Sequence, residues 1–222
     1  MPVTDGVLLK ELFDCQTPYL RALFDAHTYP WELLTALDGY LAALLSDGIE
    51  GFTRLASGIL VGRDARIAEG ATVLPPTVLG EGCEVRPGAY VRGGVITGRG
   101  CVIGNSSELK HSVLLDGVQI PHYNYVGDSI LGNRAHMGAG AVCSNLKADG
   151  GAVTVHGAKD YPTGRRKLGG ILADGADVGC GCVLNPGTVL GRRTSVYPLT
   201  ALRGVYPADC IVKDASTVVP RR

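Results

Sequence analysis

Two cations in the middle of the chain have a spacing that suits anion binding. Arg92 and Lys110 are eighteen residues apart, and each directly follows a member of a six-residue repeat. If three repeats make one coil, the two side chains lie on the same face of adjacent coils, about 4.8 Å apart. Stacked like charges are unfavourable unless something anionic bridges them, and a phosphate group is a natural bridge. The spacing therefore predicts a phosphate site, with the alternative that both side chains extend separately into water.

His122 is the histidine best placed for acid–base chemistry. It follows a proline, which restricts its backbone, and Glu108 on an earlier coil is expected to reach its second ring nitrogen and raise its basicity. A lone histidine is more often structural. The nearby Lys110, Tyr125 and Asn145 instead favour a general base in a polar site.

A six-residue repeat positions these side chains. From Val61 to Leu109 an aliphatic or similar residue recurs at every sixth position, with Thr97 as the weakest member. Small or β-branched residues recur four positions behind, from Ala65 to Val113. This period matches neither a helix nor an alternating strand. It is typical of a parallel β-helix, in which the aliphatic residue points inward and the small residue fills a corner.

The repeat is shortened by one residue at two places, between residues 109 and 114 and between residues 126 and 131. The segment at 119–128 lies between them, is rich in polar and aromatic residues, and contains His122. Departures from a local rule tend to mark functional sites. The shortened repeats therefore favour a site near this segment.

Outside the repeats the sequence predicts three further parts. Residues 1–57 are expected to form two short amphipathic helices, each starting at a proline, that cap the open end of the β-helix. A lid or a docking element is the alternative for these helices. The β-helix is expected over 58–204, with an extruded loop or hairpin at 146–166 where the repeat stops. Residues 205–222 are expected to form a C-terminal tail.

Composition and charge exclude several classes of partner. The chain of 222 residues has 21 basic and 21 acidic residues, so no general attraction to nucleic acid or membranes is expected. No window approaches the roughly 20 apolar residues of a membrane span, and the N-terminus lacks the layout of a secretory signal, so a cytoplasmic protein is expected. Cys180 and Cys182 form a C-x-C, which is not a common zinc spacing. The seven cysteines are therefore expected to be reduced and structural, with no metal site.

Motifs between Glu108 and Lys147 are similar to those of a known family. ELK is followed by PHYNYVGDSILG and then by HMGAGAVCSNLK. These segments resemble the acetyltransferase half of the bifunctional glucosamine-1-phosphate acetyltransferase/N-acetylglucosamine-1-phosphate uridylyltransferase. They are closer still to archaeal-type sugar-1-phosphate nucleotidylyltransferase/acetyltransferases and to stand-alone proteins labelled UDP-N-acetylglucosamine pyrophosphorylase-related. The resemblance covers about residues 58–205 and implies a left-handed β-helix and a homotrimer with sites between subunits.

The resemblance also implies roles for particular side chains. His122 would be the general base that deprotonates a sugar amine, and Glu108 would orient it. Arg92 and Lys110 would bind the phosphate and the sugar. Further substrate contacts are implied for Tyr125, Asn145, His136 and Lys167, the last contributed by a neighbouring subunit.

On the acetyl-coenzyme A side the resemblance implies contacts with the backbone at Ala139 and with Cys180 and Pro198. Backbone N–H groups near 138–140 are expected to stabilise the oxyanion. The expected function is therefore an acetyl-coenzyme A dependent N-acetyltransferase for an amino-sugar 1-phosphate or a related sugar nucleotide, without a metal.

Two positions depart from the family pattern, because His136 replaces a common asparagine and Leu146 replaces a sugar-contacting tyrosine. Nucleotidyltransferase activity is not expected, since residues 1–57 are too short for that domain, and a separate nucleotidyltransferase is a candidate partner. One alternative is a non-catalytic subunit that binds a sugar phosphate or sugar nucleotide. A second is a γ-class carbonic anhydrase, which the histidine spacing disfavours because its close histidine pair is five residues apart, whereas the gaps here are eleven and fourteen.

Overall fold

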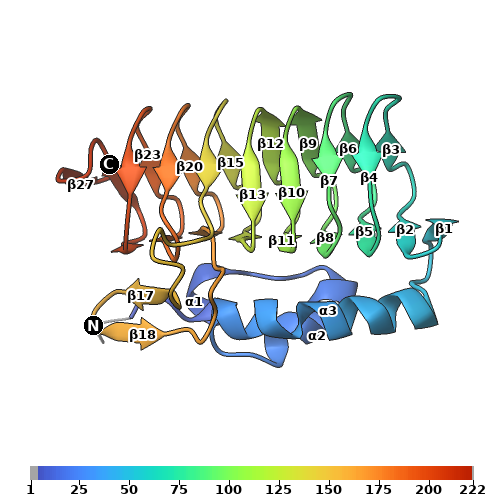
Figure 1. The fold of residues 1–222 in the computed structure, drawn as a ribbon, viewed down its shortest axis with the longest axis horizontal. Coiled ribbons are helices and arrows are strands. Elements are labelled where there is room, and N and C mark those ends of the chain that lie inside the picture. Colours follow the sequence, from blue (N-terminus) through green and yellow to red (C-terminus); the bar gives the residue numbers. More distant parts are fainter. Residues whose placement is uncertain (1–4, 222) are drawn as a thin grey trace.

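A left-handed parallel β-helix forms the body of the protein, as predicted. The structure, a computed structural model, describes residues 5–221. Short strands stack into three sheets, which we name A, B and C, and each coil adds one strand to A, then to B, then to C. Figure 1 shows the coils stacking from the N-terminal end (cyan) to the C-terminal end (red).

Pairing within the three sheets is parallel except at one end of sheet A, where β1 pairs with β2, and at one end of sheet B, where β27 pairs with β26, both in antiparallel fashion. Sheet A contains β1 (Thr53–Ala56), β2 (Ile59–Val61), β5 (Thr77–Leu79), β8 (Val95–Thr97), β11 (Ser112–Leu114), β14 (Ile130–Leu131), β19 (Ile171–Leu172), β22 (Val189–Leu190) and β25 (Val205–Tyr206). Sheet B contains β3 (Arg66–Ile67), β6 (Glu84–Val85), β9 (Val102–Asn105), β12 (Gln119–His122), β15 (His136–Met137), β20 (Asp177–Val178), β23 (Ser195–Val196), β26 (Cys210–Val212) and β27 (Val218–Pro220). Sheet C contains β4 (Thr72–Val73), β7 (Tyr90–Val91), β10 (Glu108–Lys110), β13 (Tyr125–Gly127), β16 (Val142–Cys143), β21 (Val183–Leu184) and β24 (Ala201–Leu202).

The repeated aliphatic residues fill the interior. Ile103, Leu109 and Leu114 take one position on each of the three sheets and are completely buried. Thr97, the weakest member of the repeat, is also buried, and its hydroxyl oxygen accepts a hydrogen bond from the N–H of Gly80 at 2.9 Å. The polar member therefore leaves no unsatisfied group in the core, which is the usual condition for a buried hydroxyl.

The N-terminal helices lie along the outer face of sheet A, so the expectation that they cap the open end of the β-helix was wrong (Figure 1). They are α1 (Leu9–Leu12), α2 (Pro18–Asp25) and α3 (Pro30–Asp47), and proline stands at the start of α2 and α3 as expected. None of the helices within residues 5–221 is long and apolar enough to cross a bilayer.

The helices lie along sheet A because this sheet is apolar on both faces. On its strands the residue before each inward residue is itself apolar, as at Val78, Ile96 and Ile130, and these residues belong to one buried cluster with Leu34 and Leu37 of α3. An apolar sheet face must be buried against another layer. The helices supply that layer.

The segment at 146–166 takes the hairpin form, one of the two forms expected for it, and the segment at 205–221 is more ordered than the expected tail. The first contains a hairpin of β17 (Thr154–His156) and β18 (Asp160–Pro162). Its Tyr161 ring lies 6.0 Å from that of Trp31, so the hairpin extends the helical layer over sheet A. The supposed tail continues the β-helix through β25 and β26, and β27 then closes its C-terminal end. The β-helix therefore extends beyond the boundary expected at residue 204.

Candidate active site

The corner between sheets B and C carries the first group of candidate residues. His122, Ala139, Cys180 and Pro198 occupy one stacked column there, which we name the B/C edge. Backbone hydrogen bonds between successive coils join the members of this column. The N–H of Gly140 donates to the carbonyl of His122 at 3.0 Å, and Gly181 and Leu199 donate to the carbonyls of Ala139 and Cys180, each at 2.9 Å. The structure therefore aligns the predicted base with the predicted acetyl-coenzyme A contacts.

A buried asparagine shapes the turn that presents His122. The backbone N–H of His122 donates to Asn124 Oδ1 at 3.1 Å, and Asn124 Nδ2 donates to the carbonyl of Gly138 on the next coil at 2.8 Å. The residue between them, Tyr123, has a left-handed backbone with φ of 53° and an exposed ring. His122 is exposed, and its ring makes no hydrogen bond with residues 5–221. Its imidazole is thus free to meet a ligand.

The outer face of sheet C carries the second group. Leu109 pairs with Val91, so Arg92 and Lys110 follow aligned residues on adjacent strands. The predicted alignment of these two positions on adjacent coils is therefore confirmed, and the phosphate site between them stays a prediction. Each cation lies beside a carboxylate, with Arg92 Nη1 at 2.7 Å from Glu108 Oε1 and Lys110 Nζ at 3.9 Å from Asp128 Oδ2.

Glu108 lies one coil before His122, on the other side of the same corner. It begins β10 on sheet C, whereas His122 ends β12 on sheet B. Its carboxylate pairs with Arg92, and the expected His122–Glu108 hydrogen bond is not formed within the part of the chain that the structure describes. The Arg92–Glu108 pair is about two-fifths exposed, and such pairs contribute at most about 1 kcal/mol, so an anionic ligand can compete for Arg92.

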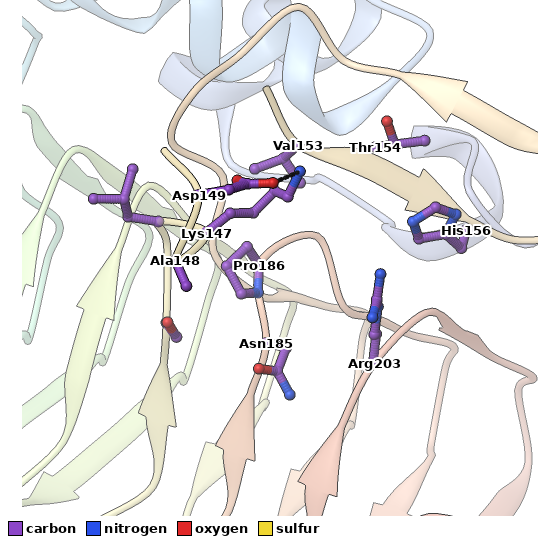
Figure 2. A pocket seen from close by; sticks show the side chains of 11 residues that line it. Lys147, Ala148, Asp149, Val153, Thr154, His156, Asn185, Pro186 and Arg203 are labelled. Carbon is purple, nitrogen blue, oxygen red and sulfur yellow. Dashed lines mark ion pairs between the residues drawn. The ribbon is translucent and has the colours of Figure 1, made fainter. Parts of the chain in front are cut away.

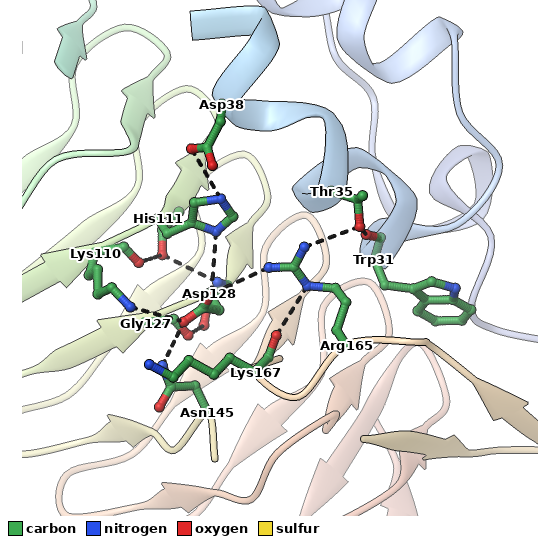
Figure 3. A network of polar contacts seen from close by, with 12 residues as sticks. Trp31, Thr35, Asp38, Lys110, His111, Gly127, Asp128, Asn145, Arg165 and Lys167 are labelled. Atoms are coloured by element: carbon green, nitrogen blue, oxygen red, sulfur yellow. Dashed lines mark hydrogen bonds and ion pairs between the residues drawn. The ribbon is translucent and has the colours of Figure 1, made fainter. Parts of the chain in front are cut away.

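Asp128 is the buried centre of this face. Its side chain is 6% exposed. One oxygen, Oδ2, accepts a hydrogen bond from Asn145 Nδ2 at 2.6 Å and also faces Lys110 Nζ (Figure 3). The predicted ligand-binding side chains Lys110 and Asn145 are therefore held by one carboxylate that sequence reasoning missed.

Substituting Asp128 by Asn is expected to make stability less sensitive to acid. Burial alone would raise the pKa of Asp128, but contacts with His111 and Asn145 and the charge of Lys110 outweigh burial and hold this pKa below its ordinary value. A lowered folded-state pKa gives stability that is present above the unfolded-state value of about 3.9 and is lost as pH falls through the folded-state value.

The wild type should therefore lose unfolding free energy more steeply below about pH 4 than Asp128→Asn, which should be the less stable protein at neutral pH. Urea denaturation across this range measures both effects. Equal pH slopes for the two proteins would contradict the assigned role of the carboxylate.

The side chains of Tyr125 and Asn145 approach each other because Gly127, which lies between them in space, has no side chain. A Cβ on Gly127 would lie 2.6 Å from Tyr125 Oη and 2.8 Å from Asn145 Nδ2. Burial, followed by the negative charges of Glu108 and Asp128, raises the pKa of Tyr125, so the phenol stays protonated and can donate a hydrogen bond.

Lys167 and His136 lie in different places. Leu146 forms an isolated antiparallel bridge with Lys167, whose side chain extends toward Asn145 of its own chain (Figure 3). His136 lies on sheet B, where its Nδ1 is 2.8 Å from Asp177 Oδ1. The single chain therefore gathers Lys167 with the sheet C residues but leaves His136 across the corner.

A groove of about 750 Å³ adjoins Asn145. It lies between the segment at 146–156 and the later coils of sheet C, and Asn185 and Arg203 form part of its wall (Figure 2). Lys147 on the opposite wall pairs with Asp149 at 3.1 Å. Within residues 5–221 no group of three or more His, Cys, Asp or Glu side chains is arranged to hold a metal ion.

The fold and these two aligned groups define a hexapeptide-repeat β-helix protein with a polar site beside one corner. Comparison with known sequences gives the relatives. Residues 82–159 match the family model described as the GMPPB C-terminal domain. The chain is 32% identical over 174 residues to a bifunctional sugar-1-phosphate nucleotidylyltransferase/acetyltransferase of Sulfurisphaera tokodaii, covering 76% of this chain and 43% of that protein. It is 27% identical over 194 residues to the bifunctional protein GlmU of Methanococcus vannielii, covering 85% of this chain and 47% of that protein.

The predicted resemblance to these bifunctional proteins is therefore confirmed, and the chain spans less than half the length of these two relatives. Among solved structures, the acetyltransferase domain of PglB from Neisseria gonorrhoeae FA1090, in complex with acetyl coenzyme A, aligns with a TM-score of 0.43 and 16% identity. That alignment covers 82% of this chain and 64% of the PglB domain.

Proposed function

We propose that the protein is an acetyl-coenzyme A dependent N-acetyltransferase acting on an amino-sugar 1-phosphate. The observation that carries the proposal is the B/C edge, where His122 stacks in one column with Ala139, Cys180 and Pro198. The aligned cations of sheet C lie on the adjoining face. Phosphate and amine of one small acceptor would then be held beside a thioester.

The backbone at the B/C edge supports a specific oxyanion donor. The N–H groups of Gly138 and Gly140 are used within the β-helix, donating to Val178 O at 2.7 Å and His122 O at 3.0 Å. The N–H of Ala139 donates to no group within residues 5–221. We therefore assign the oxyanion to Ala139, since a free N–H at a fixed position stabilises developing negative charge.

The reaction then follows from these positions. The acceptor amine attacks the thioester carbonyl carbon, and His122 takes a proton from the amine. The Ala139 N–H stabilises the resulting oxyanion. The C–S bond breaks, and coenzyme A leaves as a thiolate that takes up the proton held by His122. Holding amine and thioester together supplies much of the rate enhancement.

The exposed apolar residues beside the site favour contact with a second copy of the chain. Helices and the hairpin cover sheet A, whereas exposed apolar side chains gather on sheets B and C and at their corner, including Tyr90, Tyr123, Tyr197 and Leu199. Leu199 is 84% exposed. We propose that a homotrimer buries these residues and places the site between subunits.

Free-thiol release tests the proposed activity. Protein, acetyl-coenzyme A and a panel of amino sugars that includes glucosamine 1-phosphate are mixed, and thiol is followed with time. We expect release that depends on the acceptor. No release above that of His122→Ala across the panel would overturn the proposal. A non-catalytic sugar-nucleotide-binding subunit would instead bind a sugar nucleotide in calorimetry and show no binding of coenzyme A.

Protection of Cys180 tests the place of acetyl-coenzyme A. Cys180 is exposed, whereas burial raises the pKa of Cys15 and of Cys143 to about 12. Because the thiolate attacks the thiol reagent and must be accessible to it, a disulfide reagent should label the exposed Cys180 before the buried Cys83, although the pKa of Cys83 is lowered by hydrogen bonding. Cys180→Ser should remove the fast phase. Saturating acetyl-coenzyme A should slow this phase. An unchanged labelling rate would contradict the assigned cofactor contact.

A further inference from the structure

The carboxylate of Asp128 has two sides with different neighbours. Oδ2 faces Lys110 and Asn145, the proposed acceptor-binding side chains. Oδ1 faces two other groups, His111 Nδ1 at 3.3 Å and Arg165 Nη2 at 3.4 Å. One buried carboxylate thus joins the ligand-facing residues to a second set that the proposed mechanism does not use (Figure 3).

Both groups on the Oδ1 side reach the N-terminal helical layer. His111 Nε2 lies 3.4 Å from Asp38 Oδ1, and Arg165 Nη1 donates to Thr35 Oγ1 at 3.1 Å. Thr35 and Asp38 are three residues apart on α3, so they share one face of that helix. Helix α3 is therefore linked to Asp128 through two side chains, those of His111 and Arg165 (Figure 3).

Arg165 also fixes the end of the extruded segment. Its Nε donates to the carbonyl of Lys167 at 3.1 Å, and its side chain is 17% exposed. The planar guanidinium thus reaches α3, Asp128 and the Lys167 backbone together, which a flexible ammonium group cannot do equally well. His111, with φ of 46°, is also largely enclosed, at 16% exposure.

We propose that His111 and Arg165 are positioning residues for the acceptor, holding Asp128 so that its other oxygen orients Lys110 and Asn145. This inference rests on the proposed function for the identity of the ligand. It makes α3 and the extruded segment parts of the acceptor pocket, in addition to their role in covering sheet A. A group that only positions its neighbours should affect acceptor binding and leave acetyl-coenzyme A binding unchanged.

The test uses Arg165→Met and His111→Asn, with Arg166→Met as the matched control. Asparagine tolerates the left-handed backbone at position 111 but is too short to span Asp38 and Asp128. Arg166 is the adjacent cation, and its contact is with the carbonyl of Gly150, away from Asp128. Steady-state kinetics in the full chain give the Michaelis constants of both substrates.

We expect Arg165→Met to raise KM for the acceptor about tenfold, the size of one lost hydrogen bond to a charged group, because Arg165 Nη2 donates to Asp128 Oδ1. His111→Asn removes an ion-pair contact at 3.3 Å and should raise the same KM by a smaller factor, and KM for acetyl-coenzyme A should be unchanged in both variants. In the double variant, KM for the acceptor should rise by less than the product of the two single fold-changes, because both side chains act through one carboxylate. Equal effects of Arg165→Met and Arg166→Met, or a matching rise in KM for acetyl-coenzyme A, would overturn the inference.

If the wild type acetylates no amino sugar, the proposed function fails, and hydrogen exchange then decides the positioning inference separately. Amides at 108–111 and 127–129 should exchange faster in Arg165→Met and His111→Asn than in Arg166→Met. Equal exchange in all three variants would overturn it.

Discussion

His122→Ala is expected to lower kcat by about 10²–10⁴-fold, the usual contribution of a general base, while the protein stays folded. The ring is exposed and makes no hydrogen bond within residues 5–221, so its removal leaves neither a cavity nor an unpaired buried group. The change should appear in kcat for acetyl transfer. Thermal unfolding should be the same as for the wild type.

His156→Ala is the matched control for this prediction. His156 is also exposed, but it lies on the hairpin and pairs with Asp160 at 2.7 Å. Its substitution should leave kcat within about twofold of the wild type, as expected for a surface change away from the reacting groups. Equal kcat values for the two variants would remove the general-base assignment.

Gly104→Ala is expected to lower the unfolding free energy by about 3 kcal/mol, the upper end of the usual cost of overpacking. A Cβ at position 104 would lie 1.6 Å from the carbonyl oxygen of Pro121 on the next coil. Backbone atoms cannot rotate away from such a contact, so two coils must separate. Because Pro121 precedes His122, acetyl transfer should fall as well.

Gly39→Ala provides the opposite result from the same chemical change. Gly39 lies within α3, and a Cβ there would meet no atom within 4 Å. Replacing a helical glycine by alanine stabilises by about 0.5–1 kcal/mol. Urea denaturation should therefore give a lower unfolding free energy than the wild type for Gly104→Ala and a higher one for Gly39→Ala. A change in the same direction for both variants would show that close coil stacking does not explain the need for Gly104.

The repeat made much of the fold and part of the site predictable. Counting six-residue units identifies the inward residues and aligns Arg92 with Lys110, because strand register in a β-helix follows the repeat directly. The same counting, once the two short repeats and the extruded segment are allowed for, brings Ala139 above His122 and Cys180 above Ala139.

Contacts outside the repeat could not be read in the same way. The place of the helices depended on a second apolar row on sheet A, as at Val78 and Ile96, which does carry a sequence signal: every third repeat has two adjacent apolar residues. The Asp38–His111 and Arg165–Asp128 pairs have no such signal. They join segments of different period, and only the packing of α3 and the hairpin against sheet A brings them together.

The central claim is that acetyl transfer takes place at the corner between sheets B and C. A structure of the assembled protein with coenzyme A bound tests it most directly. We expect the sulfur beside His122 and the Ala139 N–H, with the rest of the molecule following Cys180 and Pro198. Coenzyme A bound with its sulfur elsewhere, for example in the groove beside Arg203, would contradict the claim.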